Sequence, residues 1–140
     1  MYRAYTSIIT FVVLMYCASA YALEFMPYPV ARISHEQWVT FYNEARDQLS
    51  HSQRTYRHQH MVIFLDKFNG HHYAFTLPGH AAHPSWIVRR IVNQEGELQI
   101  QQVGYYVYEE APFVDLFDAY LKLNEKMKPQ LQDSNRITLD

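Results

Sequence analysis

The dipeptide Asn69-Gly70 lies between two apolar runs and constrains the fold of this chain more than any other feature of its sequence. Asn-Gly is a strong signal for a two-residue β-hairpin turn, because both turn positions need a positive φ angle. The flanking runs, 56–68 and 71–77, are therefore expected to pair as antiparallel strands. In the register that such a turn sets, Phe64 faces Phe75. One face of the hairpin is then strongly aromatic, and we expect it to pack on a helix.

A second hairpin is expected further along the chain. The pattern predicts a strand over 86–92, a turn over 93–96 and a strand over 98–108, in which Gly104 marks a bulge or bend. Alternation along these strands places Tyr105 on the outer face with Ile87 and Ile91. Consecutive strands joined by short loops indicate a four-stranded antiparallel meander, whose apolar face needs a cover.

Two helices are expected to provide that cover. Ser34 and Gln37 have the spacing of a capping box, and the residues that follow place apolar side chains at helical intervals. The second helix begins at Ala111-Pro112, and Pro129 is expected to end it.

The sequence thus predicts an α+β fold with an N-terminal helix, a four-stranded antiparallel meander and a C-terminal helix. We expect an extended lead-in over 23–33, a single α+β domain over 34–128 and a flexible tail over 129–140. This order of elements resembles the cystatin-like architecture, at the level of architecture only. The Gln-Val-Gly inhibitory loop of true cystatins is not reproduced by the stretch 101–104, so the resemblance implies no function.

Residues 1–22 have the three-part pattern of a secretory signal peptide. Arg3 gives a positive start, an apolar stretch follows, and small residues lead up to Ala22, after which we expect cleavage. The alternative is an uncleaved anchor, since no charge interrupts 4–23. Cys17 is the only cysteine, so a cleaved product has none for disulfides or thiol chemistry. We therefore expect a periplasmic or secreted protein without stable membrane insertion after cleavage.

The histidines suggest one candidate site. All eight lie after residue 22, and the strand and loop pattern brings the following four near one another: His58, His60, His80 and His83. Imidazole is a good ligand for zinc or copper, so these residues are candidate metal ligands. Solvated surface histidines beside a hairpin are the alternative interpretation.

Catalytic motifs are missing from the sequence, and the formal net charge of −2 gives no basic surface for nucleic acid. The sheet instead offers candidate binding residues: Trp86, Ile87, Arg89, Ile91 and Tyr105. An inward arginine here would need an anionic partner such as Asp66, or a ligand. The sequence predicts an exported, non-enzymatic binding module without a cofactor (an inhibitor, immunity-type or envelope accessory protein) with a protein or small-ligand partner in the cell envelope. The alternative is a histidine-based periplasmic binder of divalent metal.

Overall fold

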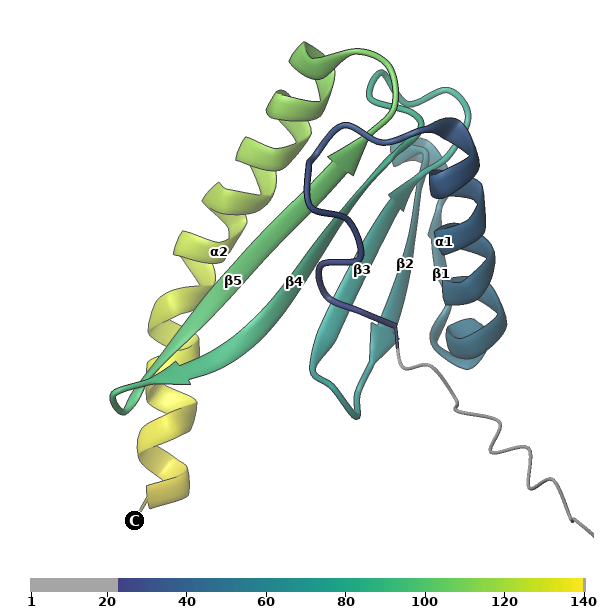
Figure 1. Ribbon diagram of the computed structural model, residues 1–140. Helices are drawn as coiled ribbons and strands as arrows, with labels where there is room; N and C mark the ends of the chain where they lie inside the picture. The colour runs from purple at the N-terminus through teal and green to yellow at the C-terminus, as the bar shows by residue number, and fades with distance from the viewer. Residues whose placement is uncertain (1–22, 140) are drawn as a thin grey trace, which may run out of the picture.

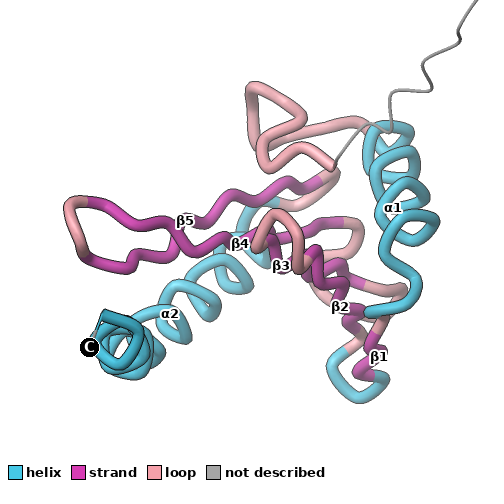
Figure 2. The backbone as a smooth tube through the Cα atoms, turned by 90° about the horizontal axis from the view of Figure 1, so that it is seen from below, coloured by secondary structure: helices cyan, strands magenta, loops and turns pink. Residues whose placement is uncertain are grey.

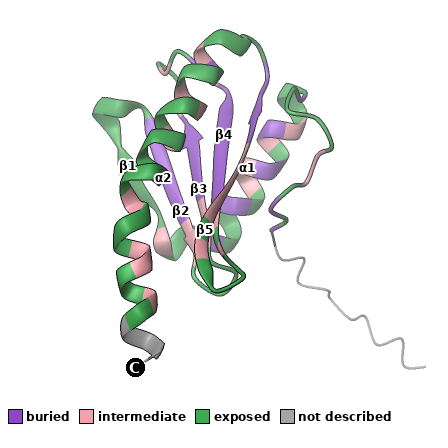
Figure 3. Cartoon of the chain, turned by 90° about the vertical axis from the view of Figure 1, so that its left-hand side faces the viewer, coloured by how far each residue is buried: buried purple, intermediate pink, exposed green. Residues whose placement is uncertain are grey.

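The computed structural model describes residues 23–139 and has an α+β fold, as the sequence predicts. Five antiparallel strands pair in chain order, with helix α1 on one face of the sheet and helix α2 on the other (Figures 1 and 2). Buried residues are concentrated in the strands between the two helices (Figure 3). The elements are α1 (His35–Leu49), β1 (Arg54–Tyr56), β2 (Met61–Asp66), β3 (His71–Thr76), β4 (Ser85–Gln94), β5 (Glu97–Tyr106) and α2 (Glu110–Leu139), with short 3₁₀ turns η1 (Ser50–Ser52) and η2 (Arg57–Gln59).

The sheet has five strands rather than the expected four, because the first predicted strand is interrupted. The turn η2 and His60, which adopts a left-handed conformation with φ of 50°, reverse the chain between Tyr56 and Met61. The segment before this reversal is β1, which pairs with β2 in antiparallel orientation. The interruption is a run of four polar residues, 57–60, which carries no glycine or proline to mark a turn in the sequence.

The hairpin of β2 and β3 has its turn at the expected place but a different register. Phe64 pairs with Tyr73 rather than Phe75, because the loop comprises four residues, 67–70. The Asp66 carboxylate stabilises this loop by accepting hydrogen bonds from the backbone and side-chain nitrogens of Asn69. The register differs by two residues, which leaves every side chain on its predicted face. The aromatic face is therefore confirmed, and it packs on α1.

Helix α1 begins with the predicted capping box, in which Ser34 Oγ accepts from the Gln37 backbone and Gln37 Oε1 accepts from the Ser34 backbone. Its apolar side covers the aromatic face, and the Phe41 ring stacks on Trp86 at 4.5 Å. The segment 23–33 covers the rest of this face, where Leu23 and Phe25 are buried in the core (Figure 1).

Helix α2 covers the opposite face, and Gly104 is where it approaches the sheet most closely. A Cβ atom at Gly104 would lie 2.7 Å from Phe113 Cζ and 2.9 Å from Ile87 Cδ1. The expectation of a bulge is wrong, since Gly104 pairs with Ile87 in an unbroken ladder. Glycine is present because the Phe113 ring occupies the space of a side chain.

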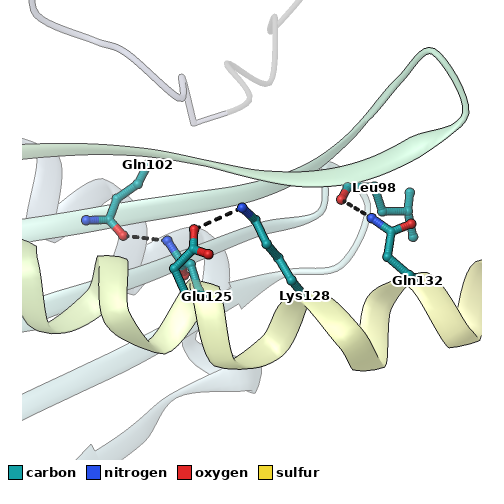
Figure 4. A network of polar contacts seen from close by, with 6 residues as sticks. Leu98, Gln102, Glu125, Lys128 and Gln132 are labelled. Atoms are coloured by element: carbon teal, nitrogen blue, oxygen red, sulfur yellow. Dashed lines mark hydrogen bonds and ion pairs between the residues drawn. The ribbon is translucent and has the colours of Figure 1, made fainter.

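Pro129 does not end α2, which continues to Leu139. Contacts with the β4–β5 hairpin hold these last turns: Gln132 Nε2 donates to the Leu98 carbonyl at 3.0 Å (Figure 4), and Asn135 Nδ2 donates to the Gly96 carbonyl at 3.1 Å. Tertiary hydrogen bonds here offset the missing proline N–H and the local preference for a break. Residues 129–139 are therefore helical rather than an irregular tail.

Candidate functional site

Three of the predicted binding residues lie in the core. Trp86 and Tyr105 pair across β4 and β5 on the α1 face, and Ile87 lies on the α2 face. The expected outer strip of Tyr105, Ile87 and Ile91 is therefore not formed, since Tyr105 lies on the opposite face from Ile87. Its prediction placed Tyr105 on the wrong face, because the face follows from the β4–β5 register, which the turn at Glu95-Gly96 sets.

The other two candidates, Arg89 and Ile91, line a pocket at the open end of the sheet. The last β3–β4 pair joins His71 to Arg90, so β4 continues beyond this point without a β3 partner. A cavity of about 270 Å³ lies where the two hairpins separate. Its accessible wall is mostly apolar and includes four aliphatic side chains, Leu65, Ile91, Ile100 and Met127.

Arg89 is the most unusual residue of this pocket, because it is a buried cation, 8% exposed, that has no carboxylate partner among residues 23–139. Its Nη1 donates to Asn124 Oδ1 at 2.9 Å, and its guanidinium carbon lies 4.8 Å from the centre of the Tyr120 ring. Its Nε has no hydrogen-bond partner. Asp66, the partner considered from the sequence, binds Asn69 instead. Among the described residues, the ion pairs join Arg46 to Asp47 and Lys128 to Glu125.

A chain of buried amides fixes the position of the guanidinium. Asn124 Nδ2 donates to Gln102 Oε1 at 2.8 Å, and Gln102 Nε2 donates to the Phe117 carbonyl at 2.9 Å, which links β5 to α2 beside the Glu125–Lys128 pair (Figure 4). These partners orient Arg89 but carry no charge that neutralises it.

His72 completes the surroundings of Arg89. A ring nitrogen of His72 lies 3.3 Å from Arg89 Nη2, and the ring centre lies 6.4 Å from that of Tyr120. Burial, together with the neighbouring Arg89 charge, lowers the pKa of His72 to about 4. The imidazole is therefore neutral at neutral pH, and it accepts a hydrogen bond from the guanidinium.

The remaining charged residues of the pocket are Arg90, Lys67 and Asp66. Arg90 Nε donates to Gln101 Oε1 at 2.8 Å, and its guanidinium carbon lies 4.1 Å from the centre of the Phe25 ring. With both histidines of the lining neutral, the formal charge of the lining residues is positive. The pocket is thus a cavity whose lining residues carry a net positive charge, while the atoms that face its open space are almost all apolar.

The four candidate metal ligands do not converge on one site, although His60 is close enough to His80, and His80 to His83, for their charges to interact. His58 lies in η2 rather than on a strand, and the His60 ring lies over Gly79. His80 Nδ1 accepts from the Ala82 backbone at 2.9 Å, and His83 Nδ1 lies 2.9 Å from Thr76 Oγ1. Burial lowers the pKa of both His80 and His83. Within residues 23–139 there is no group of three or more His, Cys, Asp or Glu side chains that could hold a metal ion.

Sequence reasoning identified Arg89 and Ile91 but missed Asn124, His72 and Met127. Asn124 had a detectable signal, because it is a polar residue within the apolar helical stripe of α2, four residues after Tyr120. A buried asparagine at such a position needs a polar partner, and here the partner is Arg89.

Fold and site together define an α+β domain with both sheet faces covered and one small cationic pocket beside a buried arginine. The chain matches no known protein family model, no curated protein and no solved structure. In the part of the chain that the structure describes, none of the helices has the length and apolar character needed to span a bilayer.

Proposed function

We propose that this protein is an exported, non-enzymatic binding module that holds a small ligand in the pocket beside Arg89. The observation that carries the proposal is the cavity itself, which remains open and mostly apolar where the β2–β3 and β4–β5 hairpins separate. Apolar concave sites with a few convergent polar groups are typical of ligand binding. The volume of about 270 Å³ is close to the lower end of the usual range, which favours a small ligand.

The chemistry of the lining favours binding over catalysis. His72 lies beside the positive charge of Arg89, and its lowered pKa makes it a poor proton acceptor at neutral pH. The Asp66 carboxylate is engaged by Asn69. Among the described lining residues there is no serine, threonine or cysteine to act as a nucleophile.

Export is the part of the proposal that depends on sequence alone. It is supported by the charged start, the apolar stretch and the small residues before Ala22. A protein of the cell envelope or the secreted fraction would meet its ligand there, and we place the module in the periplasm or outside the cell.

Titration with three eight-carbon compounds, 1-octanol, octanoate and octylamine, tests the proposal. We expect at least one of them to shift the NMR amide resonances of β3, β4 and α2 residues around the pocket. Ile100→Trp fills the cavity and should abolish the shifts, whereas Val114→Trp adds the same side chain to an exposed position of α2 and should preserve them. Failure of all three compounds, or equal binding by both variants, would overturn the proposal.

A further inference from the structure

The surroundings of Arg89 restrict the chemistry of the ligand. We infer that the ligand is a small amphiphilic carboxylate, whose head group pairs with Arg89 and whose hydrocarbon body lies against the aliphatic wall. This inference rests on the proposed function, since it names the ligand class of the same pocket.

The first argument is the missing counter-charge. A cation removed from water is unfavourable unless it is paired, and buried arginines are normally found with carboxylates or phosphates. Arg89 is at least nine-tenths buried, yet its contacts are an amide oxygen, a thioether sulfur, an aromatic ring and a neutral imidazole. A ligand carboxylate would supply the negative charge that the described part of the chain does not place there.

The second argument is the unused donor capacity of the guanidinium. Its Nε has no acceptor among the described residues but is itself buried, so the donor capacity that remains is at Nη2, whose contacts with the His72 ring are long, at 3.3 and 3.4 Å. The amide network of Asn124 and Gln102 nevertheless holds the planar group in one orientation. A guanidinium that is positioned in advance and has free donors is suited to charge-assisted hydrogen bonds with a carboxylate.

The third argument concerns charge selection by the rest of the lining. Arg90 and Lys67 add positive charge, and Asp66 is the one acidic lining residue among those described. An amine-bearing ligand would meet repulsion from these groups, while an anion would be attracted. The net positive charge of the lining residues thus favours an anionic ligand, as the missing counter-charge of Arg89 does.

The fourth argument is size and wall character. A cavity of about 270 Å³ corresponds to roughly nine water molecules. It accommodates a head group and a short hydrocarbon body, which removes apolar surface from water against Leu65, Ile91, Ile100 and Met127. Large polar anions such as nucleotides do not fit this combination of volume and wall.

The wild-type protein provides the direct test, because the three eight-carbon compounds differ in the head group, and the alkyl chain of octanoate is one carbon shorter, which by itself would weaken its binding. We expect octanoate to bind at least tenfold more tightly than 1-octanol and octylamine, and the advantage to decrease with added salt. Equal affinities for octanoate and octanol would overturn this inference and leave the proposed function standing, whereas no binding of any compound would overturn both. Tighter binding of octyl phosphate than of octanoate would overturn the assignment of a carboxylate.

Variants identify the responsible cation. In Arg89→Met, the preference for octanoate over octanol should fall by at least tenfold, while Arg90→Met is the matched control and should retain most of it. If Arg89→Met does not fold, the double variant Arg89→Met/Asn124→Leu replaces the buried polar pair with apolar side chains of similar volume and takes its place. If Arg90→Met loses the preference for octanoate and either Arg89 variant keeps it, the carboxylate binds Arg90 rather than Arg89, and the inference is overturned.

Discussion

At the scale of single residues, the lowered pKa of His72 reflects its surroundings in the pocket. The side chain is buried and Arg89 contacts it from β4, so a positive charge on His72 is unfavourable for two reasons, the loss of hydration and the repulsion from Arg89. The pKa of about 4 lies well below the usual value of 6.5, and burial is the larger of its causes. Protonation of His72 therefore opposes folding.

This depression of the pKa makes stability depend on pH. Between pH 6.5 and about 4 the unfolded chain binds a proton at position 72 that the folded chain does not, so stability is lost as the pH falls through this window. We expect the free energy of unfolding of the wild type, relative to His72→Gln, to fall by about 3 kcal/mol across the window. Urea unfolding of both proteins at several pH values measures this difference, and parallel pH profiles would contradict it.

At the scale of elements, the contact of α2 with β5 depends on the absence of a side chain at position 104. The Phe113 ring occupies that space and also stacks on Tyr106, with ring centres 4.9 Å apart. Gly104→Ala should therefore lower the free energy of unfolding by about 1–3 kcal/mol, although replacing a strand glycine by alanine normally stabilises the strand.

Thermal or urea unfolding measures this effect, and a second variant identifies its cause. Gly104→Ala/Phe113→Leu removes the ring that would clash, so the alanine substitution should cost less in the Phe113→Leu background than in the wild type. Additive effects of the two substitutions would show that the close approach of Phe113 is not responsible.

The elements also show what sequence can predict here. The Ser34–Gln37 capping box was predictable because all its contacts are local. The Asn69-Gly70 loop was found, but its register was not, because the Asp66 side chain stabilises a four-residue loop. The expectation that Pro129 ends α2 was wrong for a related reason, since the hydrogen bonds of Gln132 and Asn135 that hold the last turns join segments more than thirty positions apart.

The pocket was predictable only in part. Alternation shows that one of the neighbours Arg89 and Arg90 points inward and needs an anionic partner or a ligand, but it does not show which of the two. Its real neighbours, Asn124 and His72, come from α2 and β3, and their meeting depends on how α2 crosses the sheet. The cavity exists because β3 ends where β4 continues, and this difference follows from the actual strand registers.

At the scale of the whole molecule, the sheet is enclosed on both faces, and the segment 23–33 is part of the enclosure. Tyr105 donates from its hydroxyl to the Tyr28 carbonyl at 2.8 Å, and Arg32 forms a parallel bridge with Tyr106. The lead-in therefore completes the core on the side of β4 and β5 that α1 leaves open (Figure 1).

Two neighbouring substitutions test this role. Phe25 is buried beside Arg90 and His71, so Phe25→Ala should reduce the free energy of unfolding by about 3 kcal/mol. Met26 is 58% exposed, and Met26→Ala should change the free energy of unfolding by less than about 0.5 kcal/mol. Chemical denaturation of the two variants measures the contrast, and equally small effects would mean that the lead-in does not contribute to the core.

The β4–β5 hairpin extends beyond the end of the β2–β3 hairpin, so the β2–β3 loop lies outside the paired core of the sheet. The β2–β3 loop borders the cavity but lies beyond the last rung of the β3–β4 ladder. Lengthening that loop by an even number of residues would extend the ladder and narrow the mouth, while every core side chain would keep its orientation. The shape of the cavity can therefore change with the length of one turn, while the strand registers of the core stay as they are.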